Sequence, residues 1–245
     1  MPPAKGSSEL VVVDVHGLPR TGVEPTEQLA AVRLAFEPFP GIRNRFATWK
    51  WADATYREVA RVLQLLKRGR FASTFAPQLA DMVQSLGGQR RAFICYSGGG
   101  TIFYRWLLNQ KTSPDELCAV LIAAPHQCRE GFIVFEGDVH QVHYLVNEPA
   151  LDPRVIAQRF APGRLLVLLA ENDGTILRHN AEFPQDLVEP GHVRQVTIPG
   201  ASHSTICGDA FSHFQILEHF NQCGIGLQAD ETQQRVSPAP DLPGP

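Results

Sequence analysis

Short, nearly continuous apolar runs alternate along the chain with segments in which apolar residues recur every three to four positions. The runs predict buried strands, and the recurring segments predict helices with one face on a core. Strands are predicted at 9–15, 42–49, 92–96, 117–123, 164–170 and 193–198. Helices are predicted at 26–36, 59–66, 79–86, 101–109 and 209–222, and a short one starts at Asp152-Pro153, with the aspartate as its cap.

Strand and helix alternate throughout this pattern, which predicts an α/β fold. We expect a mainly parallel, twisted sheet of about six strands with helices on both faces. At 245 residues and 44% hydrophobic composition, the chain can form one domain with a sizeable core, which we place at 9–227. Residues 1–8 and 228–245 are polar and proline-rich and are expected to be disordered.

The segment 132–146 interrupts the alternation. Two apolar-rich runs flank Glu136-Gly137-Asp138, which is typical of a hairpin turn. The hairpin follows the strand that ends at Ala123, and residues 124–164 are too few for a large helical cap. We therefore expect a small lid, whose side chains contribute to an apolar substrate pocket: Phe132, Phe135, and Tyr144 or Leu145.

The run that ends at Ser97 leads into three glycines and then a predicted helix. A serine at such a strand–turn–helix junction needs small residues two positions before and after it, here Cys95 and Gly99, because larger side chains would collide. The hydroxyl is then presented above the sheet, and the amide of Gly98 faces a place where negative charge can develop. Ser97 is therefore a candidate nucleophile. The simpler alternative is a serine in an ordinary glycine-rich turn.

Other groups with useful chemistry follow the carboxyl ends of three further strands, where binding groups collect in a parallel sheet. His16-Gly17-Leu18 follows the first strand, Glu171-Asn172-Asp173-Gly174 follows 164–170, and the loop ending in His203 follows 193–198. Serine, acid and histidine thus occur in the chain order of α/β-hydrolases.

On these residues the chain resembles the α/β-hydrolase superfamily, in particular a small serine esterase or lipase with little or no cap. The resemblance covers roughly 9–223. It departs from the family pattern at Cys95, which stands at the first glycine of the family's serine turn. Since cysteine is also small, the turn should form with slightly wider packing between helix and strand.

The resemblance implies a triad of Ser97 as nucleophile, His203 as base and Asp173 as acid. A serine hydroxyl is a weak nucleophile unless a base removes its proton during attack, and a carboxylate holds the histidine in the required tautomer. The implied oxyanion hole consists of the main-chain amides of Leu18 and Gly98, and we expect His16 and Tyr96 beside the substrate. The expected reaction is hydrolysis of a carboxylic ester or thioester, with no cofactor.

Several alternatives stay open. Glu171 could replace Asp173 as the acid, and the competing histidines are His192, His213 and His219, of which the last two lie in the final helix. The same triad serves thioesterases and hydrolases of amide, lactone or carbon–carbon bonds, so the fold does not choose among them. A non-catalytic hydrolase-like scaffold that binds a ligand or a partner protein is a further possibility.

Composition and charge argue against several other classes of protein. A net charge of −3 argues against a nucleic-acid-binding surface, and no run approaches the roughly 18 apolar residues of a membrane span. Residues 1–9 lack the apolar core of a signal peptide, so we expect a cytoplasmic protein.

Five cysteines without regular spacing predict reduced thiols. No Cys/His pattern predicts a metal site, and His140 and His143 lack a third ligand nearby. The oligomeric state is not indicated.

Overall fold

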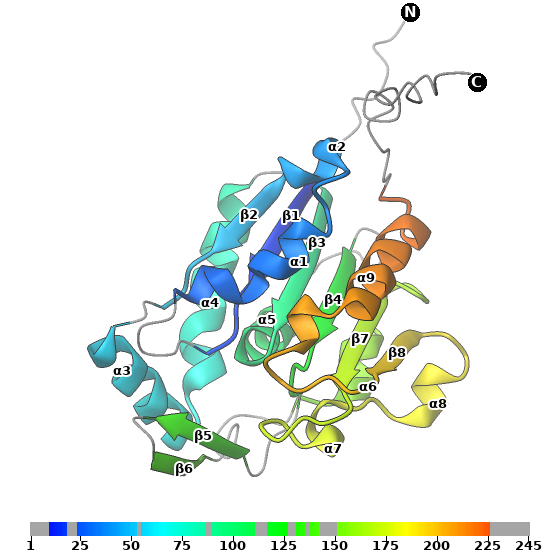
Figure 1. The fold of residues 1–245 in the computed structure, drawn as a ribbon. Helices are drawn as coiled ribbons and strands as arrows, with labels where there is room; N and C mark the ends of the chain where they lie inside the picture. The colour runs from blue at the N-terminus through cyan, green and yellow to red at the C-terminus, as the bar shows by residue number, and fades with distance from the viewer. Residues whose placement is uncertain are drawn as a thin grey trace, which may run out of the picture.

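A computed structural model describes residues 10–18, 24–52, 55–86, 90–110, 117–126, 131–135, 138–142 and 151–225. Its main element is a six-stranded sheet in the order β2-β1-β3-β4-β7-β8, in which all neighbouring strands are parallel (Figure 1). In that order the strands span Phe46–Trp49, Leu10–Val15, Arg90–Tyr96, Leu117–Ile122, Leu165–Ala170 and Val193–Ile198. The predicted parallel α/β sheet of about six strands is confirmed.

Helices cover both faces of this sheet, as predicted. Successive residues of β1 point to opposite faces, so that Val13 packs in one core with α3, α4, α5 and α6, and Val12 in the other with α1 and α9. The helices of the described segments are η1 Pro25–Leu29, α1 Ala30–Leu34, α2 Pro40–Arg43, α3 Tyr56–Lys67, α4 Phe71–Ser85, α5 Gly98–Leu108, α6 Pro153–Ala157, α7 Arg178–Ala181, α8 Gln185–Val188, η3 Ile206–Gly208 and α9 Ala210–Gln222.

Several predicted elements have different bounds. The helix expected at 79–86 is only the second half of α4, which begins at Phe71. The helix expected at 26–36 begins with the 3₁₀ turn η1 and continues as α1. The strand expected at 42–49 is only β2, because the preceding residues form α2, with Pro40 at the first helical position where its fixed φ suits a helix. The expected cap of α6 is confirmed, since Asp152 accepts a hydrogen bond from the main-chain N–H of Arg154 at 2.8 Å.

The predicted hairpin is present as a separate antiparallel pair, β5 (Gly131–Phe135) and β6 (Asp138–Val142). Figure 1 draws it at the same end of the molecule as α7, which follows the carboxyl end of β7. The turn at 136–137, residues 143–150 and all side chains of the hairpin lie outside the described residues. The expected pocket roles of Phe132, Phe135 and Tyr144 therefore stay predictions, as does the lid. The expected places of His16 and Tyr96 beside the substrate are predictions as well.

The predicted disordered ends, 1–8 and 228–245, also lie outside the described residues. Within the part of the chain that is described, no helix combines the length and the apolar character needed to cross a bilayer.

Candidate active site

Ser97 stands at the junction of β3 and α5 with an unusual main-chain conformation. Its φ of 51° and ψ of −126° lie in a region that residues with a side chain rarely adopt. The main-chain N–H of Ser97 donates to the carbonyl of Ile122 at 2.9 Å, which attaches the turn to β4. The hydrogen bond to the sheet therefore stabilises this strained conformation. The chain turns sharply at Ser97, so its side chain does not continue the alternation of β3.

The glycines after Ser97 explain how the turn is possible. A Cβ on Gly99 would lie 2.3 Å from the carbonyl oxygen of His16, and one on Gly100 would lie 2.2 Å from the Cβ of Ala124. The first turn of α5 thus packs directly on the ends of β1 and β4, and only glycine fits there. α5 begins at Gly98, three residues earlier than the periodicity of apolar residues predicts.

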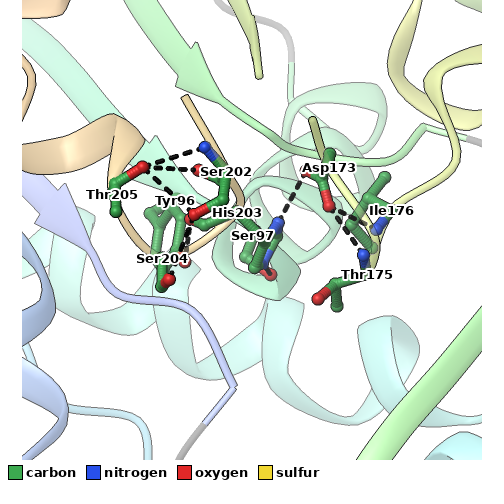
Figure 2. Close-up of polar contacts among 9 residues, drawn as sticks. All are labelled: Tyr96, Ser97, Asp173, Thr175, Ile176, Ser202, His203, Ser204 and Thr205. Atoms are coloured by element: carbon green, nitrogen blue, oxygen red, sulfur yellow. Dashed lines mark hydrogen bonds and ion pairs between the residues drawn. The ribbon is translucent and has the colours of Figure 1, made fainter. Parts of the chain in front are cut away.

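His203 lies between Ser97 and Asp173 and contacts both (Figure 2). Its Nδ1 is 2.8 Å from Oδ2 of Asp173, and its Nε2 is 3.0 Å from Oγ of Ser97. Because an ionised carboxylate can only accept, Nδ1 carries the hydrogen, and Nε2 is left to accept from the serine hydroxyl. The structure thus brings the three residues of the predicted triad into one line of hydrogen bonds.

The carboxylate is fixed by its own loop. Oδ1 of Asp173 accepts from the main-chain N–H groups of Thr175 at 2.8 Å and Ile176 at 2.7 Å, which leaves Oδ2 for His203 (Figure 2). The side chains of His203 and Asp173 are 8% and 7% exposed. Burial removes competing water, so these hydrogen bonds hold the imidazole in a single orientation.

The loops that carry Asp173 and His203 are bonded to one another. The N–H of Asn172 donates to the carbonyl of Ala201 at 2.9 Å, and Oε2 of Glu171 accepts from the N–H of Gly200 at 2.7 Å. Glu171, the predicted alternative to Asp173, therefore binds the backbone of the loop that carries His203, whereas the carboxylate that contacts His203 belongs to Asp173.

Tyr96 contacts His203 through both its hydroxyl and its ring. Its hydroxyl donates to the main-chain carbonyl of His203 at 2.7 Å, and its ring lies 5.2 Å from the imidazole, centroid to centroid (Figure 2). The contact with His203 joins residues 107 positions apart, so no local sequence pattern reveals it.

The loop after β1 lies against the serine turn. A Cβ on Gly17 would come within 3.0 Å of the Cβ of Ser97, and the side chain of Leu18 lies over Gly98. His16 is 1% exposed and stacks on Trp51, whose indole N–H donates to the His16 carbonyl at 3.0 Å. Burial lowers the pKa of His16 to about 4, so the ring is neutral and acts as packing beneath the loop.

The competing histidines lie elsewhere. The Nε2–H of His213 donates to the carbonyl of Cys207 at 2.8 Å, His192 is exposed, and His219 is buried beside two cysteines. Cys95 is completely buried, and burial raises the pKa of its thiol well above the ordinary value, which makes it a packing residue.

Comparison with known proteins adds a fold likeness. A scan against protein-family models finds no match for the chain, and a search of the curated proteins finds none. Among solved structures, the esterase PE8 matches with a TM-score of 0.53 at 14% identity, covering 91% of this chain and 96% of that one.

Two further structures match over similar lengths. A structure reported for the metagenome-derived lipolytic enzymes LipS and LipT has a TM-score of 0.54 at 13% identity and covers 90% of this chain and 95% of that one. The pyrethroid hydrolase PytH has a TM-score of 0.52 at 15% identity and covers 88% and 98%. At these identities the likeness establishes the fold.

Proposed function

We propose that this chain, which has the α/β-hydrolase fold, is a serine hydrolase that cleaves carboxylic esters through an acyl-enzyme on Ser97. The observation that carries the proposal is the line of hydrogen bonds from Asp173 through His203 to Ser97, at 2.8 and 3.0 Å. A serine hydroxyl can attack a carbonyl, an imidazole can take its proton, and a carboxylate can orient the imidazole. Ser97 also stands in a strained turn.

In the acylation step, Oγ of Ser97 attacks the carbonyl carbon of the ester while its proton moves to Nε2 of His203. The imidazolium that forms keeps its Nδ1–H on Asp173, whose negative charge stabilises it. His203 then gives the proton from Nε2 to the leaving alkoxide, and an alcohol departs as the carbon–oxygen bond breaks. The acyl group remains on Ser97.

The tetrahedral intermediate carries a negative oxygen, for which we assign two main-chain donors. Gly98 is the first residue of α5, where a main-chain N–H has no partner inside the helix. Leu18 lies against Gly98 on the neighbouring loop, so that its N–H belongs to the same region. Loss of one such donor typically lowers the rate by about 10²–10³-fold.

Deacylation repeats the same proton transfers with water. His203 removes a proton from the water as its oxygen attacks the acyl carbon, and then returns the proton to Oγ of Ser97. A carboxylic acid leaves and the serine is restored. The three residues and the two amides account for the whole cycle.

We infer that the acyl group is small or medium in size. Only residues 123–164 separate β4 from β7, and they include the hairpin β5–β6, which we assign as a short lid. A lid of this length covers a reacting group without enclosing a long chain. A preference for long, deeply enclosed acyl groups in an ester-length series would contradict this inference.

Labelling with a fluorophosphonate probe tests the nucleophile. We expect one label per chain in the wild type, none in Ser97→Ala, and full labelling in Ser85→Ala, which removes an exposed serine from α4. Persistent labelling of Ser97→Ala would overturn the assignment. Absence of labelling in the wild type would support a scaffold that only binds.

Steady-state turnover tests the reaction class. We expect hydrolysis of p-nitrophenyl esters to fall by roughly 10⁴-fold or more in Ser97→Ala and in His203→Ala. Parallel assays with acyl thioesters, amides and lactones then show which type of bond the protein cleaves best. Higher kcat/KM on thioesters would keep the triad and make the enzyme a thioesterase.

A further inference from the structure

Two cysteines and a histidine gather at a second place in the molecule. Cys118 is the second residue of β4, His219 lies in the last turn of α9, and Cys223 follows at the end of that helix. All three are buried. His219 and Cys223 share one face of the helix because they are four residues apart, and the fold brings Cys118 to that face.

The distances within this cluster match those of a zinc site. Nε2 of His219 lies 3.5 Å from Sγ of Cys118 and 3.7 Å from Sγ of Cys223, and all three atoms lie within 4.8 Å of one another. Zinc bonds of about 2.0–2.1 Å to nitrogen and 2.3 Å to sulfur at tetrahedral angles place neighbouring N and S ligands about 3.6 Å apart. The metal would therefore fit with little movement of the side chains.

The surroundings of His219 also favour a ligand role. The residue is 0% exposed, and among the described residues its Nε2 contacts only the two sulfurs. Sulfur is a weak hydrogen-bond partner, so these contacts compensate poorly for burying an imidazole. Coordination of a metal through Nε2 would supply a much stronger interaction.

The cluster lies away from the proposed active site. Ser97 bonds to Ile122 at the carboxyl end of β4, whereas Cys118 lies four residues earlier, roughly 13 Å back along the strand. Figure 1 shows α9 running away from the end of the molecule where α7 lies. A metal bound here would join the last helix to the sheet and would not touch the reacting atoms.

We propose that Cys118, His219 and Cys223 form a zinc site that fastens α9 to β4. Two thiolates neutralise the charge of Zn²⁺, and a mixed sulfur and imidazole set selects it over Mg²⁺ and Ca²⁺, which prefer oxygen. The site is independent of the proposed hydrolase activity.

The full chain, purified without a metal-affinity tag in zinc-containing reducing buffer and dialysed, tests the proposal. We expect about one zinc per chain by elemental analysis, and a fall in Tm of several degrees after removal by a chelator. Co²⁺ added to the chelated protein should give the tetrahedral visible bands and the near-ultraviolet sulfur-to-cobalt absorption of a thiolate site. Absence of both zinc and the cobalt spectrum in the wild type would overturn the proposal.

Variants locate the metal. Cys118→Ser, Cys223→Ser and His219→Gln should each lose the zinc, whereas Cys207→Ser should keep it. Cys207 is the matched control because its thiol is also buried in the core that contains α9. Ser97→Ala should keep its zinc as well, which separates this result from failure of the proposed function. Unchanged zinc binding in the three ligand variants would overturn the proposal. A disulfide between Cys118 and Cys223 in protein purified without reductant would then indicate that the two thiols form a redox pair.

Discussion

The main-chain N–H of Asn172 donates to the carbonyl of Ala201 at 2.9 Å, so the loop that carries Asp173 is bonded directly to the loop that carries His203. Glu171 adds a second bond to the same loop through the N–H of Gly200. The distance between Asp173 and His203 is therefore set by main-chain hydrogen bonds between their loops as well as by the contact of the two side chains. This relationship separates the roles of the two acidic residues.

Replacing the two acidic residues should have very different effects on ester hydrolysis. Asp173→Asn should lower kcat by roughly 10³–10⁴-fold, because it disturbs the tautomer of His203. Glu171→Ala should lower kcat by about tenfold or less, because it removes one of two bonds to the base loop. Glu171→Gln keeps an oxygen acceptor and serves as the control. A loss in Glu171→Ala as large as that in Asp173→Asn would move the acid to Glu171.

The hydroxyl of Tyr96 should contribute to stability and to the position of the base. Tyr96→Phe leaves the buried carbonyl of His203 without its donor at 2.7 Å, which should cost about 1–3 kcal/mol in the free energy of unfolding and reduce kcat. Tyr104→Phe is the matched control, since that hydroxyl is buried and has no partner among the described residues. It should be neutral or stabilising. Equal losses in both variants, measured by urea unfolding, would refute the role of Tyr96.

The close approach of α5 to β1 should make Gly99 irreplaceable. In Gly99→Ala the new methyl group would lie 2.3 Å from the carbonyl oxygen of His16 and 2.5 Å from that of Val15. Since both atoms belong to the backbone, the helix must shift, and we expect a loss of about 2 kcal/mol or more together with the activity. Gly41→Ala, where nothing lies within 4 Å of the new methyl, should change stability by less than about 1 kcal/mol.

The buried ring of His16 should make stability depend on pH. Its pKa is lowered to about 4 from an ordinary 6.5, so between these values the unfolded chain binds the extra proton and stability falls as the pH falls. Relative to His16→Gln, the wild type should lose up to about 3 kcal/mol between pH 6.5 and 4 and no more below that. Parallel stability curves for the two proteins over this range would show that His16 does not titrate in this way.

Local sequence was sufficient for most of the architecture. The apolar runs at β1, β4 and β7 are buried on both faces, which is why an almost unbroken run predicts each of them. The prediction was wrong at 42–45, where Pro40 starts a helix and shortens the strand to Phe46–Trp49. A proline favours the first position of a helix, and here it starts one where the sequence pattern predicts a strand. The pattern of apolar residues alone does not show which of the two structures forms.

The sequence by itself determined the candidate nucleophile and the strand ends from which its partners come, because glycine spacing and the geometry of parallel sheets are local and general rules. The tertiary structure decided that Asp173 and not Glu171 contacts His203, that Tyr96 bonds to the main chain of His203, and that Cys118 lies beside His219 and Cys223. Each of these depends on distances between residues 30 to 107 positions apart. Such distances are set by packing of the whole core, which no local pattern encodes.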